Sequence, residues 1–441
     1  MSKTNEKSLA EINESVAVPD VYQTAFWQKF LAYSGPGALV AVGYMDPGNW
    51  LTSLAGGGQF QYHLLTVLAL AIIVAMFMQM LAIKLGVVAR QDLAQAIAAQ
   101  LPKPWRYAAW ILNEVAMMAT DLTGVIGTAI ALKLLFGLPL LAGILLTIGD
   151  VLVVLLFLRF GIRRIEFMVL AAILTVGIIF GLEVGRAHVN SSAVLAGLLP
   201  TSLIFKNHTA LVLSLGILGA TIMPHNLYLH SSLAQSRRYD YHDPKQVHEA
   251  LRFANWDSNV HLVAAFLINA LLLVLGGTLF FGHSHALASL QAVFNGLKST
   301  AVVGSLASPM MSWLFAFALL ITGLISSITS TLAGQIVMEG YLHIRLPLWQ
   351  RRLLTRLVTL IPIIIIGCLV GFQDQTFENL IIYAQVALSV ALPFTLFPMV
   401  KLTSNPQLMG AHVNRWWTTW GGYALAGIIT ILNIYLIIAM F

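Results

Sequence analysis

Apolar residues recur along the chain in long stretches that are separated by shorter polar segments. A stretch of roughly 20 apolar residues is long enough to cross a hydrocarbon core about 30 Å thick as a helix. Continuous apolar stretches favour helices over the alternating strands of a membrane barrel. The pattern predicts eleven membrane spans, near residues 31–57, 64–88, 107–135, 139–158, 166–185, 209–234, 258–281, 311–338, 353–371, 379–400 and 420–440.

Polar residues interrupt two of these spans, the first and the sixth. The first contains the stretch "GYMDPGNW" and the sixth contains "GATIMPHNLYLHSS", and both breaks read X-P-x-N. Proline has no backbone N–H and clashes with the preceding turn, so each helix should end at or just before Pro47 and Pro224. Unwound backbone is tolerated in a bilayer only where it is buried in protein or lines a wet cavity. The two breaks therefore predict a binding site near the middle of the membrane.

The positions of the breaks also predict how the chain is organised. Spans one and six correspond to each other in two five-helix repeats, and paired broken helices of this kind point to the binding site of a transporter. We expect four segments: a polar cytoplasmic tail, a first repeat, a second and inverted repeat, and an eleventh helix with its loop, at residues 1–30, 31–200, 201–402 and 403–441.

Composition agrees with a membrane protein. The chain is 58% hydrophobic and only 10% charged, with a mean hydropathy of +0.83, whereas a soluble domain carries about a quarter charged residues. The first thirty or so residues lack the apolar core of a cleavable signal peptide. The single cysteine, Cys368, excludes an intramolecular disulfide and a C-x-x-C metal site.

The basic residues predict the orientation of the chain, because Lys and Arg near span ends stay on the cytoplasmic side. With the N-terminus in the cytoplasm, all but four of the 24 Lys and Arg residues lie in the tail or in cytoplasmic loops. The exceptions are Lys133, Arg186, Lys206 and Lys298. We expect a multi-pass cell-membrane protein with its C-terminus outside. This topology explains the formal charge of +6, and no nucleic-acid partner is inferred from it.

The atoms at the two breaks suggest what binds there. Asp46 supplies a carboxylate, Asn49 an amide oxygen, and unwinding frees carbonyls such as those of Gly43 and Ala220. Met223 adds a thioether, which suits Mn²⁺, Fe²⁺ and later first-row ions better than sodium or magnesium. A methionine in a membrane helix is more often simple packing, and a lone proline is often only a kink. An acid at a helix break is different, because a charged carboxylate in hydrocarbon is costly unless something pairs with it.

These motifs resemble the first and sixth helix signatures of the Nramp family of proton-coupled manganese and iron transporters. The resemblance continues in "MATDL", "TLAGQIVMEGY", "PLWQRR" and "AQVALS", covers essentially the whole chain after the tail, and is nearest to the bacterial manganese importers. It implies an all-α, LeuT-type fold of eleven helices in two inverted repeats plus one. It also implies metal ligation by Asp46, Asn49, the Ala220 carbonyl and Met223, with the Gly43 carbonyl and Gln385 as ligands in some conformations.

Two acids of the third span are candidates for a proton route. Glu114 and Asp121 are seven residues apart, so they lie on one helix face. The family resemblance adds Asp46 to this route, together with the residues matching His225, Arg237 and Arg352.

Three other positions leave the proton route open. Asp150 has two interpretations: it forms a hydrogen bond in helix packing, or it takes part in proton transfer. No role is assigned to His230. Many relatives carry a glutamate where this chain has Gly124. Proton coupling could therefore run through the remaining acids alone, be looser, or be lost.

Other classes of protein fit less well. A sodium-coupled amino-acid symporter could share the fold, but Asp46 would repel the substrate carboxylate. No filter-like repeat of a channel is present. Neither an H-E-x-x-H motif nor a phosphate-binding loop occurs, which argues against an enzyme and an ATPase. The expectation is an ion-gradient-driven importer that works as a monomer, with Mn²⁺ or Fe²⁺ and protons as its partners and no cofactor.

Overall fold

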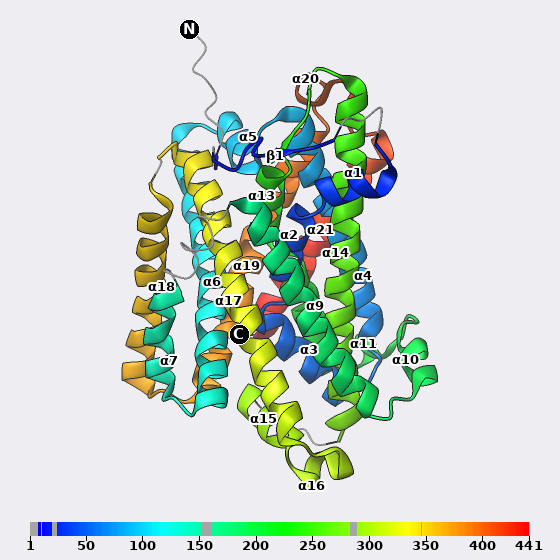
Figure 1. The fold of residues 1–441 in the computed structure, drawn as a ribbon, viewed down its shortest axis with the longest axis vertical. Helices are drawn as coiled ribbons and strands as arrows, with labels where there is room; N and C mark the ends of the chain where they lie inside the picture. The colour runs from blue at the N-terminus through cyan, green and yellow to red at the C-terminus, as the bar shows by residue number, and fades with distance from the viewer. Residues whose placement is uncertain are drawn as a thin grey trace.

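The protein is a bundle of long helices that run side by side (Figure 1). Among the described residues the only sheet is a pair of two-residue strands. The computed structural model describes residues 8–9, 11–19, 24–150, 161–282, 289–344 and 346–440, without the side chains at positions 205, 348, 352, 439 and 440.

Nine helices within these ranges are long and apolar enough to cross a membrane. They are α4 with the π-helical turn η1 (Leu65–Lys84 and Leu85–Ala89), α6 (Lys103–Phe136), α9 (Ile162–Arg186), α12 with α13 (His208–Thr221 and Pro224–Leu233), α14 (Pro244–Leu279), α17 (Pro309–Leu342), α18 (Leu348–Val370), α19 (Asp374–Thr403) and α21 (Trp416–Met440).

Two further predicted spans are present in shorter pieces. The first span consists of α2 (Pro36–Gly43) and α3 (Pro47–Phe60). The fourth begins with α7 (Leu140–Leu146) and η2 (Thr147–Gly149), and the rest of its predicted range, from residue 151 on, lies outside the described residues. The prediction of a helical membrane protein with broken first and sixth helices is confirmed.

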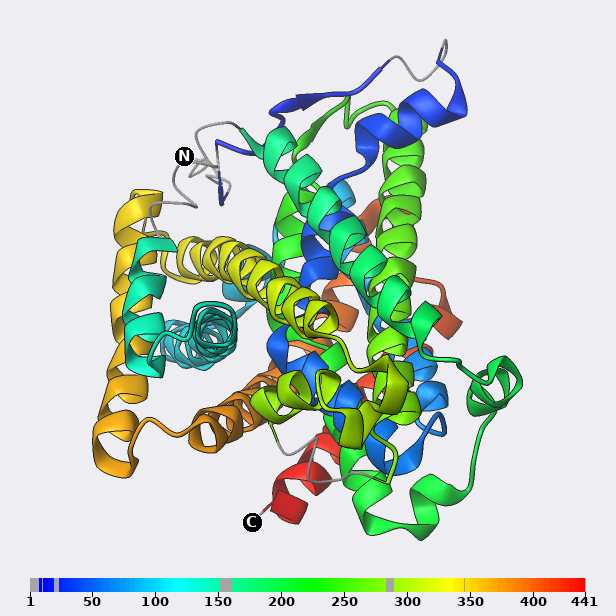
Figure 2. The ribbon, with the colours of Figure 1, turned by 60° about the horizontal axis from the view of Figure 1, so that its bottom comes forward.

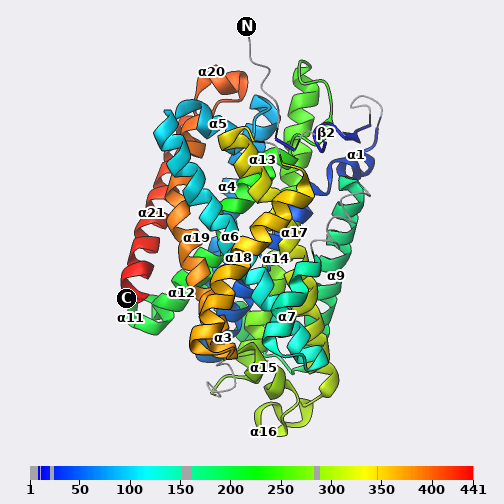
Figure 3. The ribbon, with the colours of Figure 1, turned by 90° about the vertical axis from the view of Figure 1, so that its left-hand side faces the viewer.

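Short elements cover the two ends of the bundle. One end carries β1, α5 and α20 (Figure 1). α15 and α16 lie at the other end, which comes forward in Figure 2 and is at the bottom of Figure 3. The short elements are β1 (Val16–Ala17), α1 (Phe26–Tyr33), α5 (Leu93–Gln100), α10 (Ser191–Gly197), α11 (Leu203–Lys206), β2 (Arg237–Arg238), α15 (Leu290–Leu297), α16 (Thr300–Val303), η4 (Gly304–Leu306), α20 (Pro406–Met409) and η5 (Gly410–His412).

Local chemistry explains both helix breaks. Asp46 caps the N-terminus of α3 in extended conformation, and Pro47 occupies the first helical position, where a missing N–H costs nothing. Met223 is the equivalent residue before α13, also extended (φ −116°, ψ 133°), and Pro224 follows it. Methionine offers no oxygen for capping, so the two breaks have the same backbone design but different side-chain chemistry.

The long helices hold the broken ones in the centre of the bundle. α14 packs along both α2 and α3, while α12 lies against α3 and α13 against α2. Trp50 of α3 fixes this arrangement, because its ring packs edge-on against Phe180 of α9 and Phe315 of α17, at centroid distances of 4.9 and 5.4 Å. Both halves of one broken helix therefore contact the other, and the two breaks face each other.

The described part of the expected polar tail is docked on the bundle. β1 pairs in parallel with β2, which follows α13 directly. The backbone N–H of Leu9 donates to Glu339 near the end of α17 (2.9 Å), and Glu14 forms an ion pair with Arg90 (2.5 Å). We call residues 8–9 and 11–17 the N-terminal strap. It connects α17 to the segments that follow α4 and α13.

Candidate metal-binding site

The prolines leave two carbonyls without their helical donors. In an α-helix each carbonyl accepts from the N–H four residues later. For Gly43 that residue is Pro47, and for Ala220 it is Pro224, and proline has no N–H to donate. One free acceptor therefore arises at the end of α2 and one at the end of α12, at equivalent positions of the two broken helices.

Neighbouring carbonyls of the first break are occupied by side chains. Asn269 of α14 donates to the Tyr44 carbonyl (2.6 Å), and the Trp50 indole donates to the Met45 carbonyl (3.1 Å). Buried backbone acceptors need such partners. These two bonds stabilise the unwound segment and leave the Gly43 carbonyl as the acceptor that the proline has freed.

Asp46 lies at the centre of a buried group of amides and a hydroxyl. Its side chain is 1% exposed. One carboxylate oxygen accepts from the backbone N–H and the side-chain amide of Asn49 (2.9 and 2.6 Å). The other accepts from Gln385 of α19 (3.1 Å) and Thr123 of α6 (3.4 Å). Three of the predicted metal ligands, Asp46, Asn49 and Gln385, are therefore in contact.

Glycine at position 48 allows Gln385 to approach. An ideal Cβ added to Gly48 would lie 2.1 Å from the Gln385 side-chain nitrogen, far closer than any non-bonded contact. Any other residue would displace the amide from Asp46. The sequence signal for this contact is the glycine after Pro47, but nothing in the sequence shows which side chain fills the space.

The remaining predicted ligands are buried in the second broken helix. Ala220 and Met223 are 0% and 1% exposed. Among the described residues no three His, Cys, Asp or Glu side chains group in a way that could hold a metal ion. Among the residues predicted to bind an ion between the breaks, Asp46 is the one acid, and the others offer amide, carbonyl and thioether donors.

The acids of α6 are paired with arginines of α18. Glu114 forms an ion pair with Arg351. Asp121 lies 3.2 Å from Arg356, whose guanidinium also pairs with Asp150. Asp150 therefore belongs to the same charged group as Asp121.

Sequence reasoning missed part of this charged group. It counted Arg351 and Arg356 among the cytoplasmic basic residues and gave neither a partner, although Arg356 is 1% exposed. A basic residue inside a predicted span was the available signal. The side chain of the predicted Arg352 lies outside the described residues.

The two histidines of α13 contact different neighbours. Nδ1 of His225 is 3.1 Å from the Thr120 hydroxyl, one residue before Asp121. His230 is 2.9 Å from Gln79, whose amide donates to the Tyr44 hydroxyl (2.9 Å). His225 therefore adjoins the acid-bearing face of α6, and His230 supports the first helix break.

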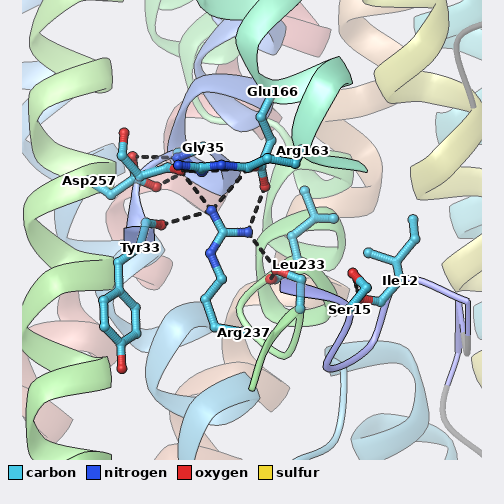
Figure 4. Close-up of polar contacts among 12 residues, drawn as sticks. Ile12, Ser15, Tyr33, Gly35, Arg163, Glu166, Leu233, Arg237 and Asp257 are labelled. Atoms are coloured by element: carbon cyan, nitrogen blue, oxygen red, sulfur yellow. Dashed lines mark hydrogen bonds and ion pairs between the residues drawn. The ribbon is translucent and has the colours of Figure 1, made fainter. Parts of the chain in front are cut away.

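Arg237 has a different environment from the acids of α6. Its guanidinium donates to both oxygens of Glu166 in α9 (2.7 and 3.0 Å) and to the carbonyls of Tyr33 and Ser34 (3.1 and 2.7 Å) (Figure 4). The segment between α1 and α2 is thus bonded to α9 and β2 through one buried ion pair.

Asp257 of α14 holds the next residues of the same segment. Its carboxylate accepts from the backbone N–H of Gly35 (3.0 Å) and of Gly37 (2.7 Å) (Figure 4). An ideal Cβ on Gly35 would lie 2.1 Å from a Glu166 oxygen, and its φ of +139° also favours glycine. We call Arg237, Glu166 and Asp257 with residues 32–37 the α2 clamp.

Comparison with known proteins assigns the family. The model of the family "Natural resistance-associated macrophage protein-like" (Nramp) matches residues 37–439. The chain belongs to the Nramp family. This is a family of membrane metal transporters and not of enzymes, and the chain is accordingly a multi-pass membrane protein.

Individual Nramp relatives match over almost the whole chain. The "Divalent metal cation transporter MntH" of Levilactobacillus brevis is 48% identical over 435 residues, which cover 99% of this chain and 94% of that protein. The protein of the same name in Staphylococcus saprophyticus is 48% identical over 442 residues, with 100% and 98% covered.

Solved structures give the same result for the fold. The Eremococcus coleocola manganese transporter, in a complex with an aromatic bis-isothiourea compound, is 43% identical, and its TM-score is 0.92 over 97% of this chain and 90% of that chain. Mhp1, a nucleobase-cation-symport-1 family transporter, is 15% identical with a TM-score of 0.60, covering 97% and 93%. That more distant likeness shows the shared LeuT-type fold alone.

Gly124, where the family resemblance predicts a glutamate, lies at a close helix contact. An ideal Cβ at this position would be 3.4 Å from the Gly323 carbonyl of α17 and 3.9 Å from the Ser326 hydroxyl, both ordinary contacts. The space beside Gly124 would therefore accept a Cβ, and packing does not require a glycine at this position.

Proposed function

We propose that this protein is a secondary transporter that imports divalent transition-metal ions, Mn²⁺ and also Fe²⁺, by alternating access. The observation that carries the proposal is the pair of facing helix breaks around Asp46. A buried carboxylate surrounded by amide donors, with two carbonyls freed by prolines and a thioether at the facing break, has the donor set of a transition-metal site.

The proposed ligands are Asp46, Asn49, the Ala220 carbonyl and Met223, with the Gly43 carbonyl and Gln385 joining in some conformations. The amide nitrogens of Asn49 and Gln385 donate to Asp46 in this structure. A bound cation takes the place of these donors, and each amide then turns its oxygen toward the ion. The same side chains that donate hydrogen bonds to the carboxylate in this structure thus become ligands.

The thioether supports a transition metal over Mg²⁺ and Ca²⁺. Those hard ions prefer all-oxygen shells, and Mg²⁺ gives up its waters reluctantly. Sulfur is an acceptable ligand for Mn²⁺ and Fe²⁺. One carboxylate with neutral donors binds a dication weakly enough to release it, which a transporter requires.

Alternating access is supported by the clamp at one end of α2. In our topology this end faces the cytoplasm. The α2 clamp bonds residues 32–37 to α9, β2 and α14, and the metal site is buried. Release of the ion to the cytoplasm requires α2 to leave these partners, while the scaffold of α6, α17 and α18 stays in place.

Proton symport is supported by the acids next to the metal site. The proposed route starts at Asp46 and reaches Asp121 and Glu114 along α6, with His225 beside Thr120. Thr123 links Asp46 to the same helix (3.4 Å). The predictions that Arg237 and Arg352 take part remain predictions, and the contacts of Arg237 favour a role in closing the cytoplasmic side.

Uptake by proteoliposomes tests the proposal. Purified protein should show saturable Mn²⁺ uptake, and a pH dye inside the vesicles reports whether protons enter with the metal. Asp46→Ala should abolish both uptake and Mn²⁺ binding, because the one acidic ligand is gone. Saturable uptake by this variant would contradict the site. Uptake of radiolabelled amino acids without metal transport would favour the amino-acid symporter instead.

A further inference from the structure

The amide of Asn226 is buried without a hydrogen-bond partner. Asn226 follows Pro224 by two residues in α13, and its side chain is 0% exposed. Neither its oxygen nor its nitrogen has a partner in the described part of the chain. Buried polar groups are nearly always hydrogen-bonded, so an orphaned amide calls for an explanation.

This amide lies against the backbone of the opposite helix break. An ideal Cβ added to Gly43 would be 2.3 Å from the Asn226 oxygen and 2.5 Å from its nitrogen. The carboxamide therefore rests on the Cα of Gly43, where only glycine leaves room for it. Gly43 is also the residue whose carbonyl loses its donor to Pro47. Asn226 of the second break thus lies against the residue of the first break whose carbonyl has lost its helical donor, without bonding to that carbonyl.

Comparison with Asn49 shows why the amide is unpartnered. Each asparagine follows its proline by two residues. Asn49 donates to Asp46, three residues before it (2.6 Å). Three residues before Asn226 stands Met223, and a thioether is only a weak acceptor. The second break therefore presents an amide that its own helix does not satisfy.

We propose that Asn226 belongs to the ligand shell of the transported ion. Its amide oxygen contacts the divalent transition-metal ion, or a water molecule that the ion carries, between the two breaks. Amide oxygen is a suitable donor for Mn²⁺. This inference rests on the proposed function, since it adds a residue to the same site.

The test compares metal binding with stability of the metal-free protein. Asn226→Leu keeps the approximate size and removes both polar atoms. Mn²⁺ affinity, measured by calorimetry with manganous chloride, should fall by about tenfold, the lower range for loss of a group that supports a metal site. The melting temperature of the metal-free variant should stay equal or rise, because an unsatisfied buried amide is removed. The stabilisation by Mn²⁺ should shrink in parallel.

Two further variants separate binding from structure. Asn226→Asp retains an oxygen ligand and should bind Mn²⁺ at least as tightly as the original protein. Asn269→Leu removes the donor to the Tyr44 carbonyl (2.6 Å). It should lower the melting temperature of the metal-free protein, because this amide has a structural role.

The outcomes distinguish this inference from the function on which it rests. If Asn226→Leu binds Mn²⁺ like the original protein, or melts earlier without metal as Asn269→Leu does, the inference is wrong. If the original protein itself gives no heat with Mn²⁺, the proposed function fails. That second result would be seen before any variant is made.

Discussion

At the scale of single residues, glycines and prolines define the candidate site as much as its ligands do. Pro47 and Pro224 remove the donors of two carbonyls. Gly48 lets Gln385 reach Asp46, because a Cβ there would be 2.1 Å from the amide nitrogen. The geometry of the candidate site therefore depends on two absent N–H groups and an absent Cβ. A substitution at any of these positions would add the atom and disturb the site.

Asp92 is a residue whose burial predicts a dependence of stability on pH. It caps α5 outside the membrane spans, and burial raises the pKa of its carboxyl to about 6 from 3.8. The unfolded chain loses this proton at lower pH than the folded protein does. The raised pKa therefore lowers the free energy of unfolding as pH rises between about 4 and 6. Above that range the decrease is complete.

We therefore expect Asp92→Asn to melt later than the original protein, by more at pH 7.5 than at pH 5. The asparagine still accepts from the Gln95 N–H and keeps the cap. Thermal unfolding of purified protein at both pH values measures the difference. Asp243→Asn is the control, since Asp243 also caps a helix, accepting from the Lys245 N–H at the start of α14 (2.9 Å), but is only half-buried. An equal rise in melting temperature at both pH values would contradict this role of the Asp92 carboxyl.

At the scale of elements, closure of one end of the protein depends on short segments. The N-terminal strap bonds to α17 and to β2, which belong to the scaffold and to the moving helices respectively in the proposed mechanism. β2 also carries Arg237 of the α2 clamp. Opening of this end must therefore break or stretch the strap.

Weakening the strap should open the cytoplasmic side more often. Val16→Pro removes the N–H that donates to the Ser236 carbonyl (3.1 Å). The reporter is Ala38→Cys on α2, which is 0% exposed here, in a Cys368→Ser background. We expect an impermeant maleimide to label inside-out vesicles faster in the Val16→Pro variant.

Ser15→Ala is the matched control for this experiment. Within the described residues the Ser15 hydroxyl donates to the Ile12 carbonyl of the strap itself (2.6 Å), so its loss should not change labelling. Equal labelling rates for Val16→Pro and Ser15→Ala, with equal melting temperatures, would show that the strap does not control this opening.

At the scale of the whole molecule, polar contacts connect the candidate metal site to α6 and α18. Asp46 accepts from Thr123 of α6, and α18 supplies the arginines that pair with Asp121 and Glu114 of the same helix. Buried carboxylates require such partners. Gly124 interrupts this series of acids at a contact where a Cβ fits.

Restoring an acid at position 124 should strengthen proton coupling. Gly124→Glu places a carboxylate one turn from Asp121 on the same helix face. We expect more protons to enter with each Mn²⁺ ion, measured with an internal pH dye and labelled manganese in the same vesicles. Gly124→Ala controls for the added Cβ. A proton-to-metal ratio identical in the two variants would mean that position 124 has no part in coupling.

The sequence alone determined the features that depend on local chemistry. Hydropathy placed the spans, because each is one continuous apolar stretch of the chain. Proline's missing N–H placed both breaks within a few residues, because that effect acts over one helical turn. The prediction that Asp46 is functional came from the high free-energy cost of a charged group in hydrocarbon. The family motifs added Gln385, which no local pattern connects to Asp46.

Only the tertiary structure decided which side chains meet. Arg356 pairs with Asp121, Arg237 with Glu166, and Asn226 lies on Gly43, across separations of tens to hundreds of residues. Such contacts depend on how helices pack and which positions lack a Cβ. Packing brings distant residues together at ångström distances, and helix periodicity alone carries no information about the partner on another helix.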